Sequence, residues 1–306
     1  MARAPGAGGL RVRATAREET VGVGDGAPTS SPAIGTDATP GARRVHAAFD
    51  QAAAYRRAAL IPYVVAGYPD ADGSHAAALA AIDGGADLLE IGLPYSDPLA
   101  DGATLQRASS VALDAGATLD RSIELLARIA SARPSVPLVP MAYANQVIGG
   151  GDGRAVATRL AEAGASGVIV ADLTPDEGAP FEEVARDVGL AVVYLVAPTT
   201  EPERRAWIAS RSGGFLYCVS LVGVTGARRS LAPAVGRLVR AVRAASPVPV
   251  AVGFGVSQPA HVRALAKAGA DGVIVASALV DALGPDGRDV TALGRLVSRL
   301  RAAITR

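Results

Sequence analysis

The chain has 306 residues, half of them hydrophobic, and a formal net charge of +1 at neutral pH. This composition provides enough apolar side chains for one large core or two small ones. Only 4% of the residues are aromatic, and no basic stripe with interleaved aromatic residues appears, so a nucleic acid is not an expected partner. Because no apolar run approaches the length of a membrane span, a membrane is not expected either.

The cysteine and histidine contents are low. The only cysteine, Cys218, cannot form an internal disulfide, which suits a reducing, cytoplasmic location. It lies in an apolar run, so we predict a core residue rather than a nucleophile. The three histidines, His46, His75 and His261, are not close in sequence to one another or to Cys218. We therefore expect no metal site.

The first 44 residues differ in kind from the rest. They are rich in Arg, Ala, Gly, Thr, Ser and Pro and show no hydrophobic periodicity. Such a segment cannot bury enough apolar area to offset its ordering entropy, so we predict a disordered extension over residues 1–44 and one catalytic domain over residues 45–306. The segment lacks the continuous apolar region of a signal peptide. An organelle transit peptide is an alternative, which the acidic residues after Arg17 disfavour.

After residue 44, apolar runs of strand length alternate with segments of helical spacing. The runs are continuous rather than alternating, which is typical of parallel strands covered on both faces. Helical spacing occurs for example at 119–132, 155–163, 228–244 and 259–268. The eight predicted strands are 60–66, 87–92, 136–142, 167–172, 191–196, 215–220, 248–254 and 272–276.

Eight strand–helix units predict an α/β fold of the (β/α)₈ type, a TIM barrel. Three helix-to-strand junctions, at 84–91, 163–172 and 268–277, have similar sequences and support this repeat. The alternative is a doubly wound open sheet. That fold usually places a glycine-rich dinucleotide turn after its first strand, and Ala66-Gly67-Tyr68-Pro69 is not such a turn.

The second predicted strand carries Glu90 inside an apolar run, and the loop after it contains Asp97 and Asp101. An ionised carboxylate in a strand interior costs several kcal/mol unless it is paired or its pKa shifts. We interpret Glu90 as a catalytic acid or base that shares a pocket with Asp101; the alternative is a glutamate that points to solvent. Tyr217, in the sixth strand, can add a hydroxyl. Asp172, after the fourth strand, is either a site residue or a hydrogen-bond acceptor at a strand end.

The last βα loops predict a phosphate site. Gly253 and Gly255 follow the seventh strand, and Ser277 follows the eighth. In TIM barrels these two loops often bind phosphate through backbone N–H groups, frequently at the start of a short helix. Gly223 and Gly226 can bring a further loop to the same place.

Several stretches resemble the tryptophan synthase alpha subunit family. The longest is Leu-Glu-Ile-Gly-Leu-Pro-Tyr-Ser-Asp-Pro-Leu-Ala-Asp-Gly at 89–102, and shorter ones occur at 143–145, 223–228 and 253–257. The resemblance runs from about His46 to the C-terminus. It implies a lyase that cleaves indole-3-glycerol phosphate to indole and glyceraldehyde 3-phosphate by a retro-aldol reaction without metal or cofactor.

The resemblance also implies roles for individual residues. Glu90 matches the glutamate that shuttles protons to indole C3 and from the glycerol hydroxyl. Asp101 matches the aspartate that accepts a hydrogen bond from the indole N–H, and Tyr217 matches a tyrosine that lines the site. The remaining expected positions are Gly226, Gly255 and Ser277 for the phosphate, Tyr63 and Phe254 for the indole ring, and Asp97 and Thr225 for loop closure.

The family works as an α₂β₂ complex, which implies a beta chain as partner. Pyridoxal phosphate is then expected only on that partner, and none on this chain. The sequence departs from the family pattern at Val65, Leu221, Ala276 and in the glycine-rich stretch 146–153, which lies near the expected beta contact.

Three other functions stay open on the sequence alone. The first is a stand-alone indole-releasing lyase that needs no partner. The second is a non-catalytic paralogue that binds and activates a beta chain, which the Glu90 and Asp101 pair argues against. The third is a different phosphate-binding barrel such as a sugar-phosphate epimerase, whose histidines and metal ligands are missing.

Overall fold

A computed structural model describes Met1 and residues 39–219, 233–253 and 255–304. Residues 2–38 of the extension predicted over residues 1–44 lie outside the described ranges. The same holds for Leu221, Thr225, Gly226 and Phe254, so their predicted roles are not tested there. None of the helices in the described ranges is long and apolar enough to cross a membrane.

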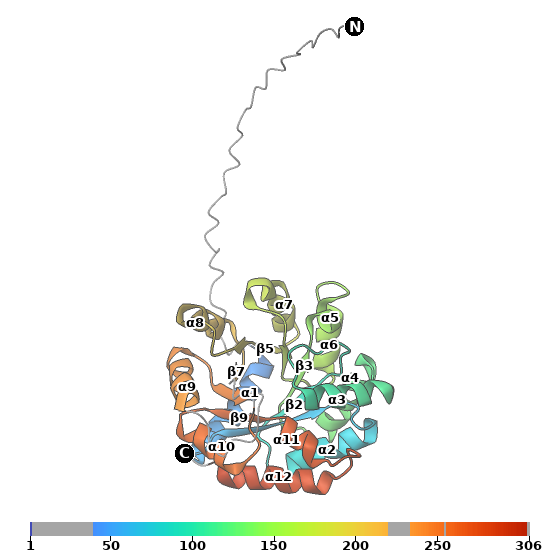
Figure 1. The fold of residues 1–306 in the computed structure, drawn as a ribbon, viewed down its shortest axis with the longest axis vertical. Helices are drawn as coiled ribbons and strands as arrows, with labels where there is room; N and C mark the ends of the chain where they lie inside the picture. The colour runs from blue at the N-terminus through green and yellow to red at the C-terminus, as the bar shows by residue number, and fades with distance from the viewer. Residues whose placement is uncertain (2–38, 220–232, 254, 305–306) are drawn as a thin grey trace. The chain divides into compact units, whose positions relative to one another are not determined.

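The strands form one parallel sheet that is rolled into a barrel (Figure 1). Neighbours in the sheet follow the order β5-β4-β3-β2-β1-β9-β8-β7-β6, so the sheet begins and ends with segments that are consecutive in the chain. The strands are β1 (Ala59–Val65), β2 (Leu89–Gly92), β3 (Leu138–Ala142), β4 (Gly167–Val170), β5 (Ala191–Val193), β6 (Leu195–Val196), β7 (Leu216–Val219), β8 (Val250–Gly253) and β9 (Gly272–Val275).

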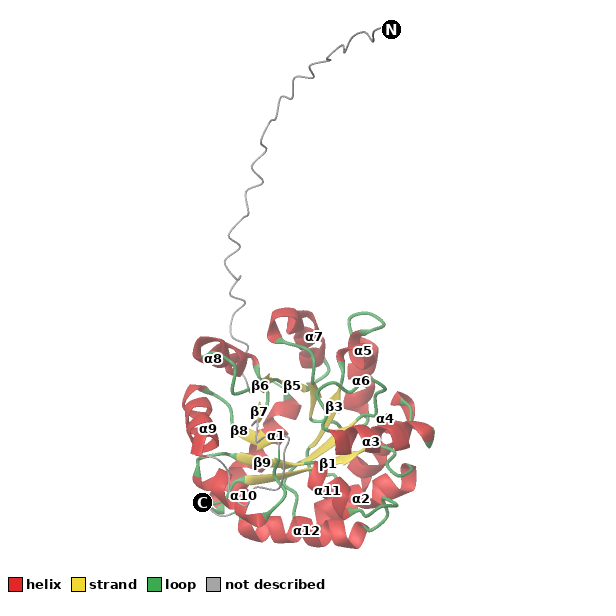
Figure 2. Ribbon diagram, viewed as in Figure 1, coloured by secondary structure: helices red, strands yellow, loops and turns green. Residues whose placement is uncertain are grey.

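Most of the helices surround the strands, whereas α1 lies in the centre of the ring that they form in the view of Figure 2. The helices of the described ranges are α1 (Pro40–Ala54), α2 (Ala71–Asp83), α3 (Ala103–Asp114), α4 (Leu119–Ala132), α5 (Ala144–Ile148), α6 (Arg154–Glu162), α7 (Pro175–Asp187), α8 (Pro202–Arg211), α9 (Pro233–Ala245), α10 (Pro259–Lys267), α11 (Ser277–Ala282) and α12 (Val290–Ala303). Each strand run is followed by at least one helix, and the predicted (β/α)₈ barrel is confirmed.

The fifth predicted strand differs from the prediction because it is split at Tyr194. β5 pairs with β4, whereas β6 pairs with β7. The Tyr194 N–H donates to Ser212 Oγ at 3.0 Å instead of to a strand. The Tyr194 carbonyl accepts from the Tyr217 N–H at 3.0 Å. The segment from β5 to β6 therefore pairs with β4 through its first part and with β7 through its second part, and this closes the barrel.

The folded domain begins earlier than residue 45, so the predicted boundary is wrong. Thr39 caps α1, since its Oγ accepts from the Ala42 N–H at 3.0 Å, and Pro40 occupies the first turn, where a missing N–H costs nothing. Val45 and Phe49 of α1 belong to the apolar cluster that fills the barrel interior. Thr39 and Pro40 form a common helix-start sequence, although the composition of the residues around them is typical of a disordered segment.

The barrel interior is apolar at the level of the strand centres. Inward-facing side chains come from the strands or from the residue just before them, and Leu195 of the short β6 packs at the edge. They include Ile61, Leu88, Val139, Ile169, Val193, Phe215, Ala251 and Ile274. Alternate residues face outward and pack under the helices. Because Glu90 is two residues after Leu88, its side chain points into the same interior.

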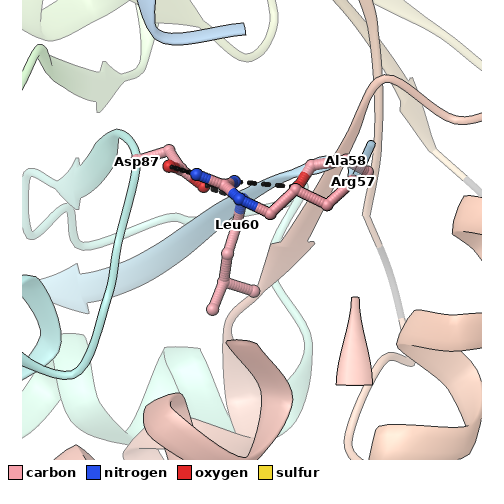
Figure 3. A network of polar contacts seen from close by, with 4 residues as sticks. All are labelled: Arg57, Ala58, Leu60 and Asp87. Atoms are coloured by element: carbon pink, nitrogen blue, oxygen red, sulfur yellow. Dashed lines mark hydrogen bonds and ion pairs between the residues drawn. The ribbon is translucent and has the colours of Figure 1, made fainter. Parts of the chain in front are cut away.

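A buried ion pair fixes the amino ends of β1 and β2. The Arg57 guanidinium donates twice to the Asp87 carboxylate, at 2.6 and 2.7 Å, and Asp87 also accepts from the Leu60 N–H at 2.8 Å (Figure 3). The two side chains are only 6% and 9% exposed. This end of a TIM barrel is the one associated with stability rather than catalysis.

We expect Asp87→Ala to lower the free energy of unfolding by about 3–5 kcal/mol, because Arg57 would remain as an uncompensated buried charge. Urea denaturation measures this loss. Asp83→Ala is the control, since the Arg133–Asp83 pair is largely exposed and its loss should cost at most about 1 kcal/mol. Equal losses in the two variants would contradict the assignment.

Candidate active site

Glu90 lies in the middle of β2 with 1% of its surface exposed. Neither carboxyl oxygen has a hydrogen-bond partner among the described residues. Burial, and then the charge of Asp101, raise the pKa of Glu90 to about 8. The side chain is therefore mostly protonated at neutral pH and can donate a proton to a ligand in the barrel mouth. The alternative of a solvent-facing Glu90 is excluded.

Two tyrosine hydroxyls flank this carboxyl group, from β1 and from β7. A Cβ atom on Gly92 would lie 1.7 Å from the Tyr63 hydroxyl, and one on Gly253 would lie 2.5 Å from the Tyr217 hydroxyl. The two glycines at the strand ends thus provide the space in which the hydroxyls sit. Burial, together with the charges of Glu90 and Asp101, raises the pKa of both tyrosines, so each keeps its proton.

Asp101 lies in the loop between β2 and α3. Its N–H donates to the Pro98 carbonyl at 3.0 Å, and its carbonyl accepts from Gln106 Nε2 at 3.0 Å, so the loop is fixed on both sides of the residue. Burial raises the pKa of Asp101 to about 6, against a hydrogen bond from Tyr143 that lowers it. At neutral pH the site therefore combines a protonated Glu90 with an ionised Asp101.

Tyr143, at the end of β3, is the residue that the sequence analysis missed. Its hydroxyl accepts from the Ala100 N–H at 3.0 Å and hydrogen-bonds to Asp101. Its ring stacks on Tyr95, with 5.1 Å between the ring centroids. The residue therefore connects the end of β3 to the loop that carries Asp101. The motif at 143–145 contained it, but nothing in the strand pattern indicated which loop it would reach.

Two sequence alternatives are resolved nearby. The Asp172 carboxylate accepts from the Ala144 N–H at 2.6 Å and so links the ends of β4 and β3, which makes it a strand-end partner. Cys218 is fully buried and carries no disulfide. Burial raises the pKa of its thiol to about 12, so it is a core residue and not a thiolate nucleophile.

The loops after β8 and β9 are neighbours because these two strands pair. Gly255 has φ of 71°, a left-handed conformation that other residues rarely adopt. Ser277 is exposed and begins the short helix α11. This is the arrangement from which barrels build phosphate sites. Gly253, in contrast, leaves room for the Tyr217 hydroxyl, which occupies the space where a Cβ atom would lie.

Asp97, Val65 and the glycine-rich stretch are the other positions that the sequence singled out. Asp97 is exposed, and its carboxylate accepts from the Ser96 hydroxyl at 2.5 Å. Val65, a departure from the family pattern, is buried against Leu105 and neighbours from α3 and α11. In the glycine-rich stretch, Gly153 has φ of 82°, and an added Cβ would contact Phe181 at 2.9 Å, so that glycine is required by the fold.

A family model described as "Tryptophan synthase alpha chain" matches residues 49–301. The chain is 46% identical over 246 residues to the tryptophan synthase alpha chain of Gloeobacter violaceus, which covers 80% of this chain and 88% of that one. It is 44% identical over 240 residues to that of Roseiflexus castenholzii, which covers 78% and 91%.

Solved structures give the same result. A structure of Mycobacterium tuberculosis tryptophan synthase superposes with a TM-score of 0.79 at 40% identity, over 86% of this chain and 98% of that chain. The tryptophan synthase subunit alpha of Legionella pneumophila has a TM-score of 0.78 at 33% identity, over 85% and 98%. Fold and sequence therefore agree, and the chain belongs to the tryptophan synthase alpha chain family.

Proposed function

We propose that this tryptophan synthase alpha chain, a lyase that cleaves indole-3-glycerol phosphate, does so by proton transfers through Glu90 while Asp101 stabilises the charge on the indole ring. The observation that carries the proposal is the difference between the two carboxyl groups. One is buried, unpartnered and protonated, and the other is hydrogen-bonded and ionised at neutral pH. Two carboxyl groups with separated pKa values are suited to separate acid and acceptor roles.

In the first step, the Glu90 carboxyl group donates its proton to indole C3, and positive charge develops on the ring nitrogen. Asp101 accepts a hydrogen bond from the indole N–H and stabilises this charge, an effect that is strong in a site that excludes water. Tyr143 holds Asp101 in place through its hydroxyl.

In the second step, the ionised Glu90 accepts the proton of the glycerol hydroxyl next to the bond that breaks. The new carbonyl forms as the carbon–carbon bond breaks, and the bonding electrons return to the indole ring. Indole and glyceraldehyde 3-phosphate leave, and Glu90 is protonated again. One proton is delivered and one is recovered, so no metal or cofactor is needed to balance the reaction.

The substrate would lie with its indole ring between Tyr63 and Tyr217 and its phosphate at Gly255 and Ser277. The geometry that supports this placement is the position of both tyrosine hydroxyls at the barrel mouth and the adjacent glycine-containing loop and helix start. Gly226 would add to the phosphate site, and Phe254 would border the ring.

A beta chain in an α₂β₂ complex is the proposed partner, and pyridoxal phosphate would belong to that chain. Structures of M. tuberculosis tryptophan synthase are among the similar structures, which supports a complex. In this chain, Leu99 is 93% exposed in the loop that also carries Asp97, an apolar side chain suited to a partner's surface. Asp97 and Thr225 would close the site when the partner binds. A cytoplasmic location is also proposed, supported by the single free cysteine.

The test is indole release from indole-3-glycerol phosphate by the purified chain, with and without a tryptophan synthase beta chain. We expect slow release by the chain alone and faster release with the beta chain. Equal, fast release under both conditions would favour the stand-alone lyase. Absence of release under both conditions would contradict the proposed function.

A further inference from the structure

A buried polar cluster lies outside the barrel at the point where the barrel closes. It consists of Glu182 on α7, Arg211 on α8 and Tyr194 between β5 and β6, and we call it the seam cluster. The Tyr194 hydroxyl donates to Glu182 Oε1 at 2.7 Å, and Arg211 Nε donates to the same atom at 3.3 Å. Arg211 also forms an ion pair with Glu182 Oε2. Tyr194 is 1% exposed, and the two charged side chains are 4% and 9% exposed.

The hydroxyl of Tyr194 is closely confined. A Cβ on Gly178 of α7 would lie 2.0 Å from this oxygen, so the helix approaches to a distance that only glycine allows. On either side, Val193 belongs to the interior cluster and Leu195 packs against it, whereas Tyr194 packs in the outer layer. The seam cluster therefore lies between the barrel wall and the helices α7 and α8, and it contacts the wall through Tyr194.

The backbone of Tyr194 holds the strand that carries Tyr217. Its N–H donates to Ser212 Oγ at 3.0 Å, and Ser212 Oγ donates to the Phe215 carbonyl at 2.6 Å. Its carbonyl accepts from the Tyr217 N–H at 3.0 Å. Both ends of the segment from Phe215 to Tyr217 are thus fixed through one residue.

We propose that the seam cluster positions Tyr217 against the substrate, which makes Glu182, Tyr194 and Arg211 positioning residues for the reaction. This inference rests on the proposed role of Tyr217 as a wall of the indole pocket. A buried ion pair is weak evidence of a stability role, because its desolvation offsets its attraction. The effect of the Glu182–Arg211 pair is geometric. It holds the Tyr194 hydroxyl and so fixes the position of Tyr194, whose carbonyl accepts from the Tyr217 N–H.

Tyr194→Phe is the most direct perturbation, because it removes the hydroxyl and leaves the Glu182–Arg211 pair in place. Affinity for indole-3-glycerol phosphate is measured by calorimetry with Glu90→Gln in every variant, so that substrate is not consumed. We expect the dissociation constant to rise on the order of five- to tenfold. In a chain that also carries Tyr217→Leu, Tyr194→Phe should alter the dissociation constant by less than about twofold.

Two further variants separate positioning from general destabilisation. Asp176→Asn breaks the exposed Arg204–Asp176 pair, which joins the same two helices at the surface, and should leave the affinity unchanged. Ser212→Ala removes the other link and should weaken binding as Tyr194→Phe does. Thermal midpoints of all variants are recorded alongside.

Two results would contradict different claims. If the effects of Tyr194→Phe and Tyr217→Leu multiply independently, or if Asp176→Asn weakens binding equally, the positioning inference is wrong while the proposed function stands. If the unmodified chain does not cleave the substrate, the proposed function fails; the affinity cycle then still decides whether the seam cluster and Tyr217 are coupled.

Discussion

Glu90→Gln is expected to lower kcat for indole release by a factor of at least about 10³–10⁴. Glutamine has nearly the same shape as the protonated carboxyl group but cannot donate a proton to indole C3 or accept one from the glycerol hydroxyl. Since both proton transfers pass through this side chain, its loss affects both steps. Substrate affinity should change much less, because the pocket walls remain.

Exposed Glu124→Gln on α4 is the matched control and should leave kcat unchanged. Stability provides a second readout. The pKa of Glu90 is raised in the folded chain from 4.5 to about 8, so the unfolded chain loses this proton first as the pH rises. The contribution of Glu90 to stability is therefore fully present below about pH 4.5 and is lost between pH 4.5 and 8. The Gln variant should become more stable relative to the unmodified chain across that range. Residual activity above a tenth of the original would contradict the role of Glu90.

Asp101→Asn is expected to lower kcat/KM by about 10²–10³, because the developing charge on the indole nitrogen loses its anionic acceptor. Asparagine retains a carbonyl oxygen but not the charge. The variant keeps the loop geometry, since the backbone bonds to Pro98 and Gln106 do not involve the carboxylate.

The pH profile distinguishes a charge effect from a loss of shape. With an ionised Asp101 and a protonated Glu90 both required, activity should rise through about pH 6 and fall through about pH 8. In Asp101→Asn the rise at acid pH should disappear while the fall at alkaline pH remains. If Asp101→Asn kept both the rise at acid pH and the fall at alkaline pH, a group other than Asp101 would set the rise.

The sequence alone was sufficient for the barrel and for the inward-facing position of Glu90. Continuous apolar runs separated by helical spacing have few other solutions, and Glu90 stands out because a charge in such a run is costly. Cys218 was also predicted correctly as a core residue, because buried thiols commonly have a structural role. For Asp172 the sequence left two roles open, and only the structure shows the strand-end contact.

What could not be read from the sequence depends on contacts between distant segments. Tyr143 reaches Asp101 only because the loop after β2 folds over the end of β3. The split at Tyr194 depends on Ser212, which is 18 residues away along the chain and replaces a strand partner. Thr39 and Pro40 indicate the start of α1, but the composition of the preceding residues led us to predict a disordered extension up to residue 44.

A titration of the Glu90 carboxyl group itself tests whether Glu90 is the proton donor. Glutamate side-chain carboxyl carbons are labelled with ¹³C, and the Glu90 signal is identified by its absence in Glu90→Gln. We expect this signal to titrate with a pKa of about 8, because the group is buried without a hydrogen-bond partner among the described residues. A midpoint near the ordinary value of 4.5 would show that Glu90 is ionised at neutral pH and would contradict its role as the proton donor.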